Sequence, residues 1–63
     1  MKWWKCTLYE KNLNGELTKE IGRSNVQSLN LDCARFVATN QFSRTVHTYR
    51  EFPHQYEIVV VKR

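Results

Sequence analysis

Apolar and polar residues alternate over the first part of the chain, which reads MKWWKCTLYEK. A period of two predicts a β-strand, because successive side chains of a strand point to opposite faces. We place this strand at 2–10. Trp3 and Trp4 then lie on opposite faces, and Cys6 and Leu8 share the face of Trp4. This face is expected to pack against the core.

The dipeptide Asn14-Gly15 follows this strand and is the strongest short-range signal of a β-hairpin. A two-residue turn there predicts a second strand at 16–23, reaching at most Val26. The expected cross-strand pairs are Leu13 with Glu16, Glu10 with Lys19, Tyr9 with Glu20, and Leu8 with Ile21. The apolar pair of Leu8 with Ile21 falls on one face, as a half-buried hairpin requires. The charged pair of Glu10 with Lys19 lies on that same face, nearer the turn, where the hairpin is expected to extend beyond the core.

The hydrophobic period changes after residue 26 to that of an α-helix. One broad sector of a helical wheel collects Leu31, Ala34, Val37, Ala38 and Phe42. We therefore expect a helix from 30 to 42, capped by Ser28 or Asn30, with Asp32 in its first turn. Phe36 points away from the apolar sector.

The segment SRTVHTYREF, residues 43–52, gives mixed signals. Its three β-branched residues prefer strands, which predicts a loop or a short irregular strand. Because no Gly or Pro precedes Pro53, the alternative is a helix that continues to about residue 50, with Tyr49 extending its apolar sector. After Pro53, the run QYEIVVVKR predicts a final strand at 55–62.

The expected element order is strand, strand, helix, strand. A helix that leaves the second strand crosses over and returns the third strand parallel to it, and the first strand fills the slot between them. The predicted fold is therefore α+β: a three-stranded antiparallel sheet in the order 2-1-3 with one helix packed on one face (ββαβ). The 63 residues are expected to form a single domain.

The composition is that of a small globular protein, with 41% hydrophobic and 13% aromatic residues. No apolar run reaches the ~20 residues that cross a bilayer, and the first residues lack a secretory signal pattern. We therefore expect a cytoplasmic protein in which Cys6 and Cys33 are free thiols. A Cys6–Cys33 bridge is the alternative.

No residue pattern points to catalysis, to a metal or to a cofactor. The spacings of Cys6, Cys33, His47 and His54 match no zinc pattern. The serines lie in no nucleophile context, and no glycine-rich phosphate loop is present. Cys33 is expected to be a small buried hydrophobe. These observations predict a protein that acts by binding rather than as an enzyme.

A single helix leaves the other face of the sheet open. The first strand contributes Trp3, Lys5 and Tyr9 to that face, and we assign Val59 and Val61 of the final strand to it. Trp and Tyr are enriched at binding hot spots, so we expect this face to bind a partner. The alternatives are a face that is simply exposed, a face covered by the ambiguous segment, and a symmetric homodimer through it.

The expected function is docking of this face, or of a free strand edge, onto an acidic or apolar surface of a larger protein. By analogy alone, the protein is expected to be a small regulator or inhibitor, of the kind that viruses also encode, because such proteins are often of this size. The alternative is binding of single-stranded DNA or RNA, which the net charge of +4 favours. The residues for that alternative are Trp3, Lys5, Tyr9, Arg23, Lys62 and Arg63. A separate basic flank beyond the helix could be formed by Arg35, Arg44 and Arg50.

Overall fold

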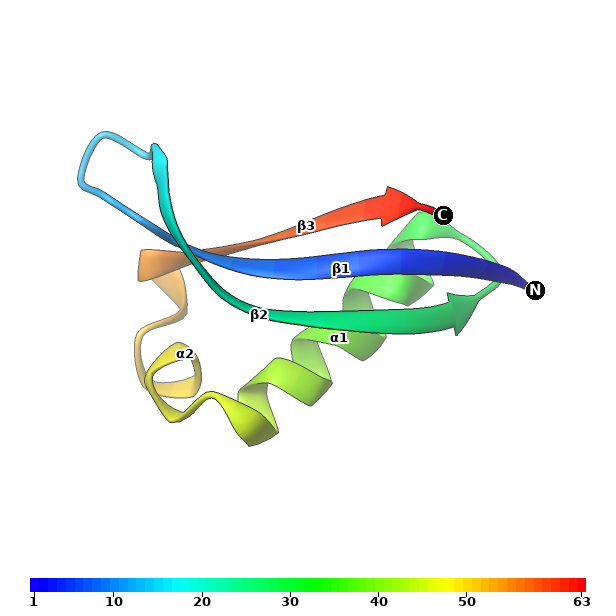
Figure 1. Ribbon diagram of the computed structural model, residues 1–63. Coiled ribbons are helices and arrows are strands. Elements are labelled where there is room, and N and C mark those ends of the chain that lie inside the picture. The colour runs from blue at the N-terminus through cyan, green and yellow to red at the C-terminus, as the bar shows by residue number, and fades with distance from the viewer.

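The computed structural model describes all residues, 1–63. In chain order the elements are β1 (Lys2–Lys11), β2 (Leu17–Ser28), α1 (Leu31–Thr45), α2 (His47–Glu51), the 3-10 turn η1 (Pro53–Gln55) and β3 (Tyr56–Lys62). The strands form one antiparallel sheet in the order β2-β1-β3, and α1 lies against one face of it (Figure 1). The predicted α+β fold and sheet order are confirmed.

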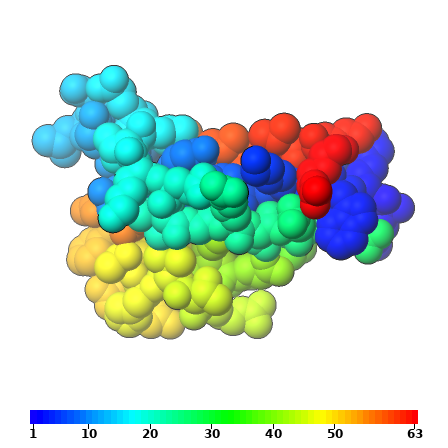
Figure 2. Space-filling view, in the orientation of Figure 1, coloured from blue at the N-terminus to red at the C-terminus, as the bar shows by residue number.

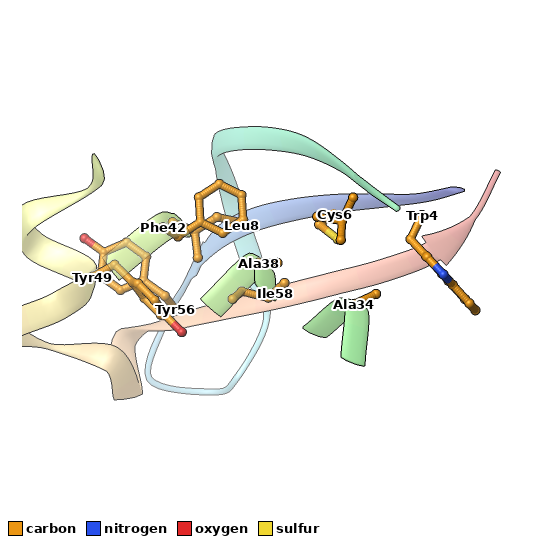
Figure 3. Packing of buried hydrophobic residues seen from close by; sticks show 10 residues of the cluster. Trp4, Cys6, Leu8, Ala34, Ala38, Phe42, Tyr49, Tyr56 and Ile58 are labelled. Carbon is orange, nitrogen blue, oxygen red and sulfur yellow. The ribbon is translucent and has the colours of Figure 1, made fainter. Parts of the chain in front are cut away.

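The core lies between the sheet and α1, as Figure 3 shows. Its central residues are Trp4, Cys6 and Leu8 of β1 and Ala34, Ala38 and Phe42 of α1. The small side chains of the two alanines let α1 approach β1 closely. The indole N–H of Trp4 donates to the carbonyl of Ser28 at 3.2 Å, so this buried polar group is satisfied. Trp4 is 8% exposed and Trp3 is 50% exposed, which confirms that the two tryptophans face opposite sides.

The apolar sector of α1 is narrower than predicted. Leu31 and Val37 are 41% and 37% exposed, because a three-stranded sheet does not cover the whole predicted sector of the helix. Cys33 is exposed, so the prediction that it is buried is wrong, and both thiols are free. Of the two predicted caps, Asn30 is the one observed: its side-chain oxygen accepts the backbone N–H of Cys33 at 2.9 Å.

The turn between β1 and β2 contains one residue more than predicted. The side-chain oxygen of Asn12 accepts the backbone N–H groups of Asn14 and Glu16, both at 3.0 Å. Asn12 therefore pairs with Glu16. Gly15 has a φ of 84°, the left-handed conformation that a three-residue hairpin loop requires. The predicted pair of Leu13 with Glu16 is wrong, whereas the pairs of Tyr9 with Glu20 and Glu10 with Lys19 are confirmed.

A bulge at Ile21 changes the register of the rest of β2. Leu8 lies opposite Gly22 and not opposite Ile21, so that predicted pair is wrong. Phe42 packs over Gly22, where an added Cβ atom would lie 3.3 Å from the ring atom Cε1. Beyond the bulge, β2 continues to Ser28, further than the predicted end at Val26.

The segment 43–52 is mostly helical, so the predicted loop or irregular strand is wrong and the alternative of a longer helix is closer. The helix is interrupted at Val46, whose backbone is extended, and α2 follows. Tyr49 of α2 packs edge-to-face on Tyr56, with ring centroids 5.7 Å apart. This burial outweighs the strand preference of the β-branched residues. The segment lies on the helix side of the sheet, so it does not cover the opposite face (Figure 1).

Candidate functional site

The sheet face opposite α1, which we call the open face, carries four rows of side chains. Each row has a β1 residue between neighbours on β2 and β3. The rows are Gln27–Trp3–Arg63, Asn25–Lys5–Val61, Arg23–Thr7–Val59 and Glu20–Tyr9–Glu57. Side chains in directly opposite positions have Cβ atoms about 4.5–5.5 Å apart. The register thus places Val59 and Val61 on the same face as Trp3, Lys5 and Tyr9.

Cations surround Trp3 at one end of the open face. A hollow of about 690 Å³ is lined by Lys2, Trp3, Asn25, Lys62 and Arg63. The backbone N–H of Arg63 donates to the carbonyl of Trp3 at 3.0 Å, which holds Arg63 beside the indole. Figure 2 shows the residues near position 63, in red, against those near position 1, in blue, at this end of the molecule.

A second hollow of about 350 Å³ adjoins the first and shares Asn25 and Arg63 with it. Its other lining residues are Lys5 and Arg23. We call the two together the basic hollow. Its five cations are half of the ten Lys and Arg residues of the chain, and no Asp or Glu lines it. The indole of Trp3 therefore lies within a strongly positive local field.

One of these cations has an acidic neighbour. Arg23 Nε donates to Glu20 Oε2 at 2.6 Å, in an exposed ion pair three residues apart in sequence. The hydrogen bond and the negative charge of Glu20 raise the pKa of the Arg23 guanidinium. Arg23 is therefore always charged, but it contributes less net positive potential than Lys5 or Arg63.

The opposite end of the open face is acidic. Tyr9 lies between Glu20 on β2 and Glu57 on β3, six residues along β1 from Trp3. A separation of six residues in a strand corresponds to about 20 Å. The structure therefore does not bring Tyr9 together with Trp3 and the cations, and the residues expected to form one site are split between a basic end and an acidic end.

The apolar residues of the open face do not form a continuous patch. Val61 is 54% exposed, but Val59 and Tyr9 are half-buried and Thr7 is buried. Lys5 lies between Trp3 and Thr7 on β1, and Arg63, the residue after β3, flanks Trp3. Charged groups therefore interrupt the exposed apolar surface of Trp3 and Val61.

The His, Cys, Asp and Glu side chains of the protein do not gather into a cluster. No group of three or more His, Cys, Asp or Glu side chains gathers where a metal ion could bind. His47 contacts Arg50 and Glu51 on the exposed surface of α2, both at 2.7 Å. Burial raises the pKa of the Cys6 thiol, an effect that the charge of Arg35 partly offsets.

The expected basic flank beyond the helix is not one surface. Arg35 reaches the β3 side of α1, where Nη1 donates to the carbonyl of Ile58 at 2.8 Å. Arg44 lies on the β2 side, in a hollow that it shares with Arg23. Arg50 belongs to α2 and contacts His47.

Sequence reasoning missed Lys2 and Asn25 as members of the site. The alternation of β1 puts Lys2 on the face of Trp4, but Lys2 stands at the end of β1, where it lines the hollow beside Trp3. Asn25 lies in the part of the second strand, between residues 23 and 26, that was expected only as an extension, and it was not assigned to a face. The alternation of Arg23, Asn25 and Gln27 with Val26 could have revealed it, because that run continues the period of two.

A scan against protein-family models, a search of curated proteins and a search of solved structures gave no match. No helix in the structure has the length and apolarity needed to span a membrane.

Proposed function

We propose that this protein is a non-enzymatic binding protein and that the basic hollow around Trp3 binds single-stranded DNA or RNA. One observation carries this proposal: a half-exposed indole stands among five cations, with no Asp or Glu side chain in the lining. An apolar protein surface would leave these cations without partners, whereas a nucleic acid supplies a base for the indole and phosphates for the cations.

Each part of the hollow has a corresponding part of the ligand. A base stacked on an aromatic ring contributes ~1–3 kcal/mol, and cations beside the ring follow the phosphates. Asn25 supplies an amide that can donate to or accept from a base edge. Tyr9 is excluded from this site, because a phosphate near it would be repelled by Glu20 and Glu57.

A second candidate function is docking of the same face onto another protein. The exposed side chains of Trp3 and Val61 favour it, since aromatic anchors are common at protein interfaces. The surrounding cations require that the protein surface be acidic. Failure of every oligonucleotide to bind, together with tight association with an acidic protein, would favour this candidate.

The test is a tryptophan-fluorescence titration with a mixed-sequence single-stranded oligonucleotide, using Trp3→Ala and Phe36→Ala. Phe36 is a matched control, because it is an exposed aromatic residue on α1 away from the sheet (68% exposed). The loss of one stacked base predicts that Trp3→Ala binds ~5- to 150-fold more weakly. Phe36→Ala should bind like the wild type.

Trp3→Ala lacks the tryptophan whose emission reports binding. Its affinity is therefore measured by competition with a labelled oligonucleotide. The remaining Trp4 is buried, so its unchanged emission would show that the variant is folded. Equal affinities of the two variants would refute the proposal.

A further inference from the structure

A third hollow adjoins the basic hollow at Arg23 and lies around the edge of the sheet. This hollow, of about 450 Å³, lies between β2 and the C-terminal part of α1. Its lining residues are Arg23, Ser24, Gln41, Phe42, Arg44 and Thr45. Two of these residues, Arg23 and Arg44, are cations. As in the basic hollow, no Asp or Glu belongs to the lining. Arg23 lines both hollows, so the two lie side by side at the β2 edge.

The floor of this third hollow is fixed, and one of its two cations, Arg44, is free to contact a ligand. Ser24 Oγ donates to Gln41 Oε1 at 2.6 Å, which ties β2 to α1 and leaves the amide NH₂ of Gln41 as a donor. Arg44 makes one long hydrogen bond, from Nε to the carbonyl of Asn40 at 3.4 Å. Its Nη groups therefore remain available for a phosphate.

We infer that a nucleic acid bound at Trp3 continues over the β2 edge beside Arg23 and that Arg44 binds a further phosphate there. This inference rests on the proposed function and specifies its ligand. Because Arg23 shares its charge with Glu20, Arg44 supplies the main attraction beyond the edge. We call the path from Trp3 past Arg23 to Arg44 the track. It turns from the sheet layer to the helix layer, and a flexible single strand can follow this turn. A duplex cannot, since its persistence length is about 150 base pairs.

The length of the track sets the length of ligand that reaches Arg44. From Trp3 to the row of Arg23 the track covers four residues of β1, or about 13 Å, which corresponds to about four stacked nucleotides at ~3.4 Å each. Crossing to β2 and descending to the α1 layer adds about 15 Å, given strand and layer spacings of about 5 and 10 Å. At this stacked spacing, an oligonucleotide of about eight nucleotides spans the distance from Trp3 to Arg44.

The experiment compares Arg44→Gln with the wild type on (dT)4 and (dT)12 over a range of salt concentrations. Arg44→Gln should weaken binding of (dT)12 and make its log–log salt slope less steep by ~0.7, the value of one lost phosphate contact. The affinity for (dT)4 should be unchanged. Arg44→Lys, which keeps the charge, should restore most of the slope with (dT)12.

Arg50→Gln is the control, because Arg50 is an exposed arginine of α2 outside all three hollows. The inference is overturned if Arg44→Gln leaves the (dT)12 slope unchanged, or if it weakens (dT)4 as much as (dT)12. A wild type that binds neither oligonucleotide would overturn the proposed function itself, and the inference with it. Equal binding of (dT)12 and of a 12-base-pair duplex, both weakened by Arg44→Gln, would also contradict the single-strand track.

Discussion

Removal of three cations around Trp3 should change the salt dependence of nucleic-acid binding by a calculable amount. The variant Lys5→Gln/Lys62→Gln/Arg63→Gln removes three of the five cations of the basic hollow. All three side chains are exposed, so their replacement leaves the core intact. The expected loss is therefore one of phosphate contacts and not of folding.

The magnitude follows from counterion release. Each phosphate contact of a single strand contributes about −0.7 to the slope of log K against log salt, so five contacts predict a slope of about −3.5. Between 50 and 200 mM salt the wild type then loses roughly 100-fold in affinity, whereas the variant, with two contacts and a slope of about −1.4, loses only about 7-fold. The assay is a fluorescence titration with (dT)6, which has the five phosphates that five contacts need, at four salt concentrations.

A control variant with the same net charge separates the effect of cations in the basic hollow from the effect of the protein's total charge. Lys11→Gln/Lys19→Gln/Arg50→Gln lowers the net charge by the same three units but changes residues outside the basic hollow. It should keep the wild-type slope. If both triple variants flatten the slope equally, net charge and not the hollow drives binding, and the argument for a site at Trp3 fails.

Three further predictions concern the fold. Gly22→Ala should lower stability by ~1 kcal/mol, or about 4–8 °C in Tm, because its Cβ would press on the buried ring of Phe42; a raised Tm in thermal unfolding would contradict this. Folded protein should react with one equivalent of a thiol reagent, at Cys33, and the buried Cys6 should react only on unfolding; two fast thiols would be the opposing result. Because burial raises the pKa of the Cys6 thiol above its ordinary 9.0, the unfolded chain ionises first, so stability is complete below pH 9 and falls as the pH rises above it. Urea midpoints from pH 8 to 10 should fall less in Cys6→Ala than in the wild type, and equal falls would contradict this assignment.

The sequence predicted the sheet because its strongest signals are local. Alternation in β1 separates Trp3 from Trp4, and the crossover rule then orders the strands. It did not predict the register beyond Tyr9, because the expected pairing continued unbroken past Gly22, although a glycine within a strand can mark a bulge. The packing of Phe42 over Gly22 joins residues distant in sequence, so no local pattern predicts that contact.

The same limit applies to the helices. The β-branched residues after position 43 favour a strand, but the burial of Tyr49 on Tyr56 makes the segment helical. That contact joins residues seven apart through a turn at Pro53, and its energy cannot be read from propensities. Because this segment packs on the helix side, the open face remains uncovered.

The members of the candidate site were largely predictable, but their grouping was not. Trp3, Lys5, Arg23, Lys62 and Arg63 were expected near the open face, and all five line the basic hollow. Tyr9 was grouped with them because it shares their face. The neighbouring Glu20 was predicted, but Glu57 required the register of β3, which places it on the other side of Tyr9. The division of the face into a basic and an acidic end therefore comes from pairing between strands.

The central claim is that the Trp3 end of the open face binds single strands, and chemical-shift mapping tests it most directly. Labelled protein would be titrated with (dT)8 while its backbone amide signals and the two indole N–H signals are followed. The account predicts saturable shifts of the Trp3 indole and of amides in 2–5, 23–27 and 61–63, with little change at Tyr9, Phe36 or the Trp4 indole. Shifts centred on Tyr9 or on the exposed side of α1, or no shifts at low salt, would contradict it.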